Sequence, residues 1–238
     1  MEKIELLYDF HIHSCLSPCG DDEMTPQMIV DCAIAKELDC IAITDHNISG
    51  NCAAAIKYAE DKDIIVLPGM ELQTSEDIHV VCLFDDLDNA LDFESYVRST
   101  MPPMTNNRSV FGNQICILPD GSTYEEEQML LVGSGIQLYG LYELVSAYGG
   151  IAIPAHIDRD SFSVGSVLGT LDPYMGFPIV EVWKDSTLAD AVSVPYIQSS
   201  DAHNIDMFFD REYYSLFADE KTVSSVFNAL KTMGLKID

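Results

Sequence analysis

Short, almost uninterrupted runs of apolar residues recur along the chain and alternate with segments of helical character. Such runs are typical of strands that are buried on both faces, as in parallel sheets covered by helices. The repeated alternation of strand and helix predicts parallel βα units. Seven runs are expected to form strands: Ile4–His13, Cys40–Asp45, Ile64–Leu72, Ile78–Phe84, Gly150–His156, Ile179–Trp183 and Tyr196–Asp201.

The segments between these strands predict helices. Thr25 followed by Pro26 marks a helix start, because Thr caps a helix and Pro fits its first turn. An apolar stripe then runs through Met28, Ile29, Cys32, Ile34, Ala35 and Leu38. Further helices are expected at Asn51–Lys62, Gln137–Tyr148 and Thr222–Met233.

Residues 85–135 interrupt this rhythm within what we expect to be a single domain, residues 1–238. An acidic helix is expected at Asp88–Thr100, and turn-forming pairs such as Pro102-Pro103 and Asp120-Gly121 follow it. Turn-rich insertions in barrels are usually surface loops, and some serve as lids, because barrel sites lie in the loops after the strands. Two interpretations stay open: a solvated elaboration, or an insertion that covers the site.

The composition narrows the classes of function. The formal net charge is −27 with only 12 Lys and Arg, which argues against binding of long nucleic acids but not against a small phosphorylated substrate. No signal pattern opens the chain, and no apolar run approaches the ~20 residues that span a membrane. We therefore expect a soluble, cytoplasmic protein whose seven cysteines are reduced thiols. The sequence does not determine the oligomeric state.

All six histidines lie at or beside an end of a predicted strand, where barrel proteins build their sites. Five lie at C-terminal ends, and His79 opens its strand instead. Residues two apart in a strand point to the same face, so His11 and His13 can reach one metal, as can Asp201 and His203. Imidazole nitrogens together with carboxylate oxygens suit Zn, Fe or Mn.

Five segments, DFHIHS, AITDHN, PGMEL, PAHIDR and SSDAHN, resemble in order the motifs of the PHP (polymerase and histidinol phosphatase) family of metal-dependent phosphoesterases. The resemblance covers most of the chain, although the middle insertion matches only loosely. It implies an α/β fold, a distorted seven-stranded barrel with two or three divalent metals at the C-terminal ends of its strands.

The resemblance also implies a set of metal ligands. It assigns the first metal to His11, His13, Glu71 and Asp201, a second, bridged by Glu71, to His79 and His156, and a third to His46 and His203. Many members carry another His six residues after the His-x-His pair, where this chain has Cys19. Cys19 is either a thiolate ligand, which would favour Zn, or a bystander in a turn. We expect Asp9 and Asp45 to accept the far N–H of a ligand imidazole.

The hypothesis for the chemistry is in-line attack on phosphorus by a hydroxide that bridges two metals. Asp201 is the candidate proton acceptor, His203 the candidate that stabilises or protonates the leaving group, and Glu71 the bridge between metals. Arg159 and Lys184 are placed to bind the phosphate, with a surface position as the alternative for each.

Three functions remain open at this stage. The first is hydrolysis of a small phosphorylated metabolite or nucleotide. The second is an amidohydrolase-like C–N hydrolase, whose metals are often bridged by a carboxylated Lys on the fourth strand, although no Lys occurs in Ile78–Phe84. The third is a metal-binding regulatory module without turnover. Fold alone does not decide between them.

Overall fold

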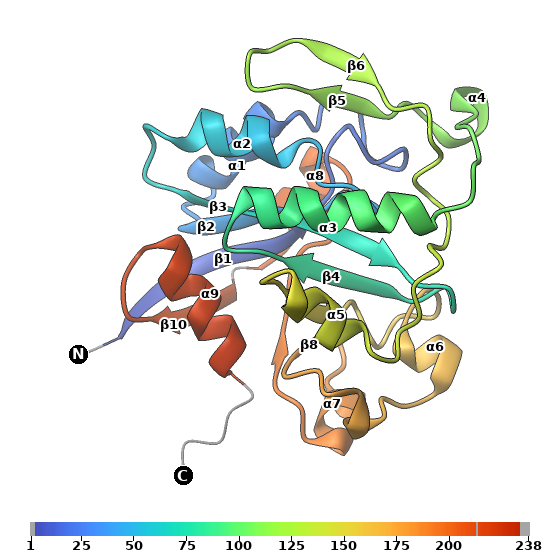
Figure 1. The fold of residues 1–238 in the computed structure, drawn as a ribbon. Helices are drawn as coiled ribbons and strands as arrows, with labels where there is room; N and C mark the ends of the chain where they lie inside the picture. The colour runs from blue at the N-terminus through green and yellow to red at the C-terminus, as the bar shows by residue number, and fades with distance from the viewer. Residues whose placement is uncertain (1–2, 213, 234–238) are drawn as a thin grey trace.

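The computed structural model describes residues 3–212 and 214–233. Its central element is a curved, mixed sheet (Figure 1). The six strands of this sheet are, in spatial order, β10 (Tyr214–Ala218), β1 (Ile4–Ile12), β2 (Cys40–Ile43), β3 (Ile65–Gln73), β4 (His79–Leu83) and β7 (Ile151–Pro154).

Strand direction departs from the prediction at one place that matters for the site. Strands β1, β2 and β3 are parallel, as predicted, but β4 is antiparallel to both β3 and β7. The prediction of a parallel strand was wrong here because only residues 74–78 connect β3 to β4. A parallel crossover needs a dozen or more residues, and a connection of five residues can therefore only reverse the chain. The N-terminal end of β4 therefore lies beside the C-terminal ends of its neighbours.

Strands β8 (Val180–Glu181) and β9 (Tyr196–Ile197) form a second, parallel pair. Backbone hydrogen bonds beside this pair join it to the six-stranded sheet on two sides. On one side the N–H of Ile157 donates to the carbonyl of Glu181 at 2.9 Å. On the other, the N–H of His13 donates to the carbonyl of Ala202, also at 2.9 Å. All seven predicted strands are thus present, and the distorted α/β barrel is confirmed in the form of a half-barrel. Strand β10 was not predicted.

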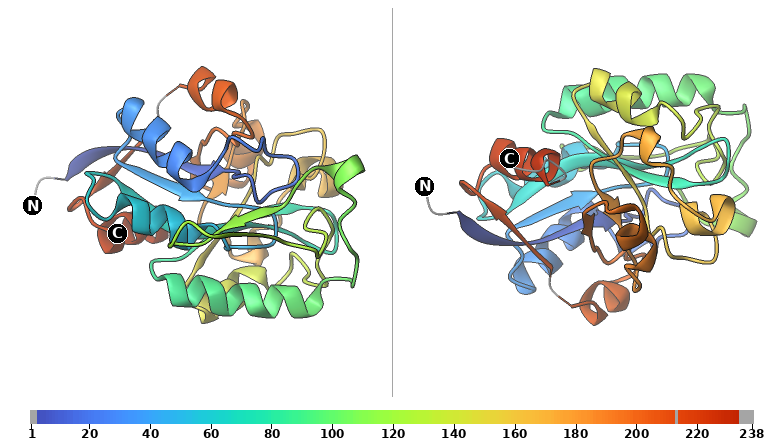
Figure 2. Two further views of the ribbon diagram at one scale, coloured as in Figure 1. Left: turned by 90° about the horizontal axis from the view of Figure 1, so that it is seen from above. Right: turned by 90° about the horizontal axis from the view of Figure 1, so that it is seen from below.

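Helices cover both outer sides of the sheet. Figure 2 shows α3 and α5 on one side and α1 and α8 on the other. The helices are α1 (Pro26–Ala35), α2 (Cys52–Ala59), α3 (Leu87–Thr100), α4 (Arg108–Phe111), α5 (Leu141–Ala147), α6 (Val164–Leu168), α7 (Thr187–Val192), α8 (Ile205–Asp210) and α9 (Val223–Thr232). A 3-10 helix spans Pro173–Met175.

Helix α1 starts where the sequence predicted it, but it turns a different face to the core. The hydroxyl of Thr25 accepts the N–H of Met28 at 3.2 Å, as an N-cap does. Ile29 is buried as expected, whereas Met28 and Ile34 are 40% and 42% exposed. Ala35 is exposed as well, so the predicted stripe was wrong at these three positions, and Val30 and Ala33 are buried in their place.

The insertion at residues 85–135 begins with α3, whose Ala90, Phe93 and Val97 are fully buried in the core. A hairpin of β5 (Ile115–Ile117) and β6 (Thr123–Glu125) follows. The end of the insertion is tied to the loop after β2, because the side-chain amide of Asn47 donates to the carbonyls of Leu130 and Val132 at 2.8 and 3.0 Å. The insertion thus returns to the edge of the sheet that carries the histidines.

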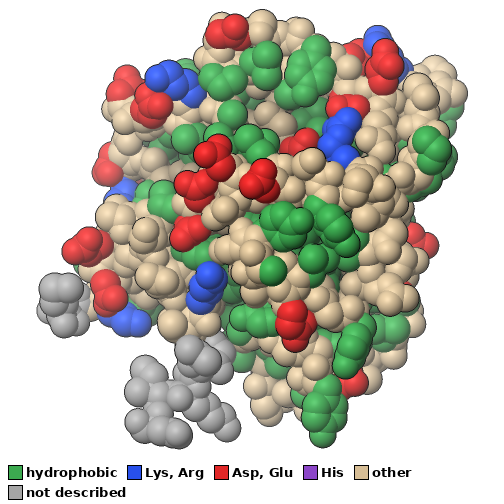
Figure 3. All heavy atoms as spheres, viewed as in Figure 1, with side chains coloured by type: hydrophobic (Ala, Val, Ile, Leu, Met, Phe, Trp, Pro, Cys, Tyr) green, Lys and Arg blue, Asp and Glu red, His purple; other side chains and the backbone are tan. Residues whose placement is uncertain are grey.

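The surface agrees with the acidic composition. On the face drawn in Figure 3, Asp and Glu side chains are spread widely and the few Lys and Arg stand singly among them. All seven cysteines are unpaired, and Cys40 and Cys82 are buried. Among the residues that the structure describes, no helix has the length and apolar character needed to cross a membrane.

Candidate metal centre

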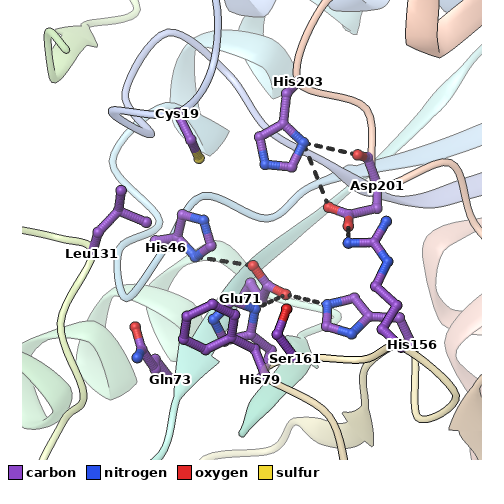
Figure 4. A pocket seen from close by; sticks show the side chains of 12 residues that line it. Cys19, His46, Glu71, Gln73, His79, Leu131, His156, Ser161, Asp201 and His203 are labelled. Carbon is purple, nitrogen blue, oxygen red and sulfur yellow. Dashed lines mark hydrogen bonds and ion pairs between the residues drawn. The ribbon is translucent and has the colours of Figure 1, made fainter. Parts of the chain in front are cut away.

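Glu71, at the end of β3, is the centre of the histidine cluster. Five imidazoles approach its carboxylate within 3.3 Å: His11, His13, His46, His79 and His156. All five, like Glu71, are buried. Figure 4 shows three of them, His46, His79 and His156, around Glu71. The sixth, His203, stacks on His13 with ring centroids 4.2 Å apart. The sequence thus identified residues that the fold brings together.

The direction of the strands explains how this cluster forms. His11 comes from the end of β1, His13 directly follows β1, and His156 lies two residues after the end of β7. His46 pairs with Glu71 through an isolated parallel bridge. His79 opens β4, and because β4 runs backwards, its first residue lies at the edge where the other strands end. The apparent exception among the six histidines therefore follows the same geometry as the rest.

The potential ligand atoms fall into three overlapping groups whose members lie within 4.8 Å of one another. These groups are His11, His13 and Asp201; His46, Glu71 and His79; and His13, Cys19, His46 and His203. The first and third resemble the sets expected from the sequence, and the third contains Cys19. In the second, His46 takes a place expected for His156, whose Nε2 lies 3.2 Å from Glu71 Oε1.

The donor atoms fit metal ions better than they fit one another. His46 Nδ1 and Glu71 Oε2 are 2.9 Å apart, and Nε2 of His11 and His13 are 3.2 Å apart. His46 Nδ1, Glu71 Oε2 and Asp201 Oδ1 are buried without a hydrogen-bond partner, which is rare for buried polar atoms. Imidazole nitrogens and carboxylate oxygens that converge in this way suit a multinuclear site for divalent metals.

The electrostatics keep the carboxylates of this centre ionised. Burial alone would raise the pKa of Glu71, but the imidazoles of His79, His11 and His46 hold this pKa well below its usual range. Burial is likewise outweighed at Asp201, whose pKa is held low by His11 and His13. Burial lowers the pKa of His46 to about 3 and that of His203 to about 4. At His11 and His13 the facing carboxylates outweigh burial and raise the pKa, to about 9 for His13, so a metal would displace a proton from each of these two imidazoles. Ionised carboxylates and neutral imidazoles are the forms that bind metals.

A cavity of about 310 Å³ opens onto this cluster. It is lined by Cys19, His46, Glu71, Gln73, His79, Leu131, His156, Arg159, Ser161, Phe162, Asp201 and His203. Figure 4 shows Cys19, His46 and His203 around one part of the cavity. Burial raises the pKa of the Cys19 thiol, and the carboxylates of Glu71 and Asp201 raise it further. The sulfur is therefore a thiol unless a metal binds it.

The sequence profile of the PHP domain matches residues 9–162, well over half of the chain. The chain belongs to the PHP domain family. This confirms the family predicted from the five motifs and places the chain in a superfamily of metal-dependent phosphoesterases.

Two curated relatives and one solved structure illustrate the range of this family. The chain is 36% identical over 73 residues to a 3',5'-nucleoside bisphosphate phosphatase of Chromobacterium violaceum, covering 31% of this chain and 25% of the relative. It is 29% identical over 100 residues to the 5'-3' exoribonuclease Rnm of Escherichia coli, covering 40% of this chain and 33% of the relative. The chain thus spans a quarter to a third of the length of these relatives.

The fold is shared with the lesion-specific endonuclease Q of Pyrococcus furiosus, at a TM-score of 0.70 and 18% identity. The match covers 98% of this chain and 57% of the endonuclease. At this identity the similarity concerns the fold alone.

Asp9 and Asp45 do not contact the ligand imidazoles in the way we expected. Asp45 accepts hydrogen bonds from the hydroxyls of Ser14 and Ser17, both at 2.6 Å. The Ser17 hydroxyl in turn lies 3.0 Å from His13 Nδ1, so Asp45 orients His13 only through Ser17. Asp9 accepts backbone N–H groups, including that of Ser200 at 3.0 Å. The prediction of direct contact was wrong because both carboxylates turn toward backbone and hydroxyl donors.

Glu181 has the role that was expected of these aspartates, and the sequence analysis missed it. Both of its carboxylate oxygens lie 3.0 Å from His11 Nδ1, and Oε1 also accepts the N–H of His156 at 3.1 Å. A carboxylate on the far nitrogen fixes the tautomer of a ligand imidazole and leaves Nε2 free for a metal. The available signal was a Glu inside the apolar run Ile179–Trp183.

Replacing Glu181 with Gln is expected to weaken metal binding by about 10- to 100-fold, because the amide lacks the charge that orients His11 and makes it basic. Competition with a metal-chelating dye measures this affinity. Glu126→Gln is the matched control, since Glu126 is also buried but forms a bidentate pair with Arg98 outside the cavity. Equal affinities in the two variants would reduce Glu181 to a packing role.

The two predicted phosphate-binding cations differ in position. Arg159 lines the cavity, and its Nη1 lies 2.5 Å from Asp201 Oδ2. Its guanidinium lies 3.7 Å from the centre of the Trp183 ring, over which Arg211 also lies, at 3.3 Å. Lys184 is exposed, does not line the cavity and has its ammonium 5.9 Å from that ring. The fold thus brings Arg159, but not Lys184, to the metal centre.

Proposed function

We propose that the chain hydrolyses phosphate esters of small metabolites or nucleotides, using two or three divalent ions of Zn, Mn or Fe. The observation that supports this most is Glu71, a buried carboxylate that five imidazoles approach within 3.3 Å. Several facing atoms of the cluster lack hydrogen-bond partners, which is the arrangement expected for metal ligands.

The proposed roles follow from the three groups of ligand atoms. The ligands are His11, His13, Cys19, His46, Glu71, His79, His156, Asp201 and His203. Bound metals would supply Lewis acidity and lower the pKa of a coordinated water. Asp201 is the candidate proton acceptor, because its buried carboxylate faces His11, His13 and the cavity. His203 is half-buried and lines the cavity, and it would stabilise or protonate the leaving group.

Arg159 would bind the phosphate that is attacked. Its guanidinium is held by Asp201 and by the face of Trp183, so little side-chain freedom is lost when it binds an anion. A fixed cation beside the metals strengthens the binding of a phosphate, whereas it adds little to the binding of a neutral C–N bond. The bridging carboxylate would be Glu71 on β3, and no Lys occurs in Ile78–Phe84, the strand on which amidohydrolases often carry a carboxylated Lys. These two residues favour phosphoester hydrolysis over the amidohydrolase alternative.

The size and charge of the site favour a small substrate. A volume of about 310 Å³ is at the lower end of the range of ligand cavities, roughly 300–1,000 Å³. The net charge of −27 would repel a long phosphate backbone. That argument remains a prediction, because an exoribonuclease and a DNA endonuclease are among the related proteins. We further propose that residues 85–135 border the substrate through Leu131, which lines the cavity.

A panel of phosphomonoesters and nucleotides, assayed with Mn, Fe and Zn, tests this function. The variant Arg159→Ala tests whether Arg159 binds the phosphate. A charge-assisted, bidentate contact is worth about 1.5–3 kcal/mol, so kcat/KM should fall ~10- to 100-fold at unchanged metal content. Arg159→Lys should restore only part of the activity. Inorganic phosphate should inhibit the parent protein more than the Ala variant.

The matched control is Arg108→Ala on α4, an exposed guanidinium that pairs with Glu125 and does not line the cavity. This variant should keep full turnover. A parent protein that hydrolyses no member of the panel with any of the metals would refute the proposed function. Full activity and full phosphate sensitivity of Arg159→Ala would show that Arg159 does not bind the phosphate.

A further inference from the structure

One aromatic side chain at the mouth of the cavity has no part in metal or phosphate binding. We propose that Phe162, together with Leu131 and Gln73, forms a subsite for a nucleobase, which makes nucleotides the substrate class of this site. This inference rests on the proposed function and specifies its substrate.

The ring of Phe162 is placed as a stacking platform. It lies nearly parallel to the imidazole of His79, with an interplanar angle of 14° and centroids 4.8 Å apart. The residue lines the cavity and is 44% exposed. One face of the ring is thus covered by His79, while the exposed part is available to a ligand in the cavity. Planar bases stack on such rings whatever their sequence of donors and acceptors.

The backbone indicates that this position is maintained against a local cost. Phe162 has φ of +52°, a left-handed conformation that is unfavourable for any residue with a Cβ. Its carbonyl accepts the N–H of His79 at 2.9 Å, which ties the loop to the start of β4. Conformations of this kind persist where the surroundings hold them, and they concentrate at ligand-binding sites.

The platform lies at a suitable place relative to the metals and to Arg159. His79 Nδ1 is 2.8 Å from Glu71 Oε1, so a single imidazole separates Phe162 from the centre of the cluster. Leu131 and Gln73 lie on one side of Glu71, and Asp201, the partner of Arg159, lies on the other (Figure 4). A nucleotide has the same layout, since a ribose separates its base from its phosphate.

Gln73 can recognise the edge of a base. Its Nε2 donates to the carboxylate of Asp77 at 2.9 Å, and because a carboxylate only accepts, this bond fixes which end of the amide carries the oxygen. Gln73 is buried and lines the cavity. The remaining amide oxygen is an acceptor for the exocyclic amino group of a base, next to the apolar side chain of Leu131.

The test compares adenosine 5′-phosphate with ribose 5-phosphate, which has a hydroxyl in place of the base, on the metal-loaded protein. Hydrolysis is followed as kcat/KM, and binding is followed through Trp183, the single Trp of the chain, which lies against Arg159. The parent should bind and turn over the nucleotide about 10-fold better or more. Phe162→Ala should lower the ratio of the two kcat/KM values toward one, because the nucleotide loses more than ribose 5-phosphate does, while Phe162→Tyr should keep the ratio.

The control is Phe217→Ala, which removes a 58% exposed ring from β10, at the end of the sheet remote from the site. It should change neither substrate. An equal fall for both substrates in Phe162→Ala would mean that the ring only supports His79. Equal affinity of the parent for both would also overturn the subsite, even if both are hydrolysed. Base-dependent binding without any hydrolysis would retain the subsite and reject the proposed function.

Discussion

Glu71→Gln is expected to reduce phosphoester hydrolysis by at least ~10³-fold, the order found for single electrostatic groups in catalysis. The carboxylate lies within 3.3 Å of five imidazoles, so the loss of its negative charge would affect all of these candidate ligands. Gln has nearly the same shape but no charge, and its amide would direct an N–H toward atoms that must face metals. Steady-state kinetics together with elemental analysis measure the effect, and the metal content should fall as well.

The control for this variant is again Glu126→Gln, which neutralises a buried carboxylate away from the cavity. It should lose some stability through its pair with Arg98 but keep its turnover. Circular dichroism confirms that both variants are folded. Near-normal turnover of Glu71→Gln with a full complement of metal would remove Glu71 from the centre of the site.

Removal of the metals is the second large effect that we expect. The purified protein should contain about two or three ions of Mn, Fe or Zn per chain, and a chelator should abolish hydrolysis until one of these ions is restored. Metals that bind only the folded chain also stabilise it. At a free concentration ~1,000-fold above Kd, one site contributes about 4 kcal/mol, so the Tm should rise by roughly 8–16 °C.

Cys19 provides a finer test of the same prediction. Because its ligand atom groups with those of His13, His46 and His203, Cys19→Ala should lower the metal content by about one ion per chain. Cys32→Ala is the matched control, a half-buried thiol on α1 that belongs to none of the ligand groups. A folded, active protein that holds no metal and cannot be reconstituted with it would contradict the metal centre altogether.

The sequence predicted the residues of the cluster better than their connections. His-x-His, Asp-x-His and Glu71 could be recognised because strand ends in a barrel share one edge. The reversal of β4 could have been inferred from the five residues between β3 and β4, but the apolar run Ile78–Phe84 reads the same in either direction. Strand β10 was missed because an edge strand alternates between buried and exposed residues instead of forming a continuous apolar run.

Side-chain partners that are distant in the sequence could not be predicted. Glu181 contacts His11 across 170 residues, and nothing in its neighbourhood identifies that partner. Arg211 lies over Trp183 without any motif that marks it. Phe162 became noticeable only through its exposure and its backbone conformation, neither of which can be read from the residue type.

The seam between β1 and the segment after β9 has a consequence for biosynthesis. The bond from the N–H of Ser200 to Asp9 joins residues 191 positions apart, and the ligands His11 and Asp201 meet beside it. Chains are made at about 5–20 residues per second, so His11 waits roughly 10–40 s for Asp201. During that time the nascent chain presents histidines without their carboxylate partner. Any metal that needs both His11 and Asp201 can therefore bind only after residue 201 has been synthesised.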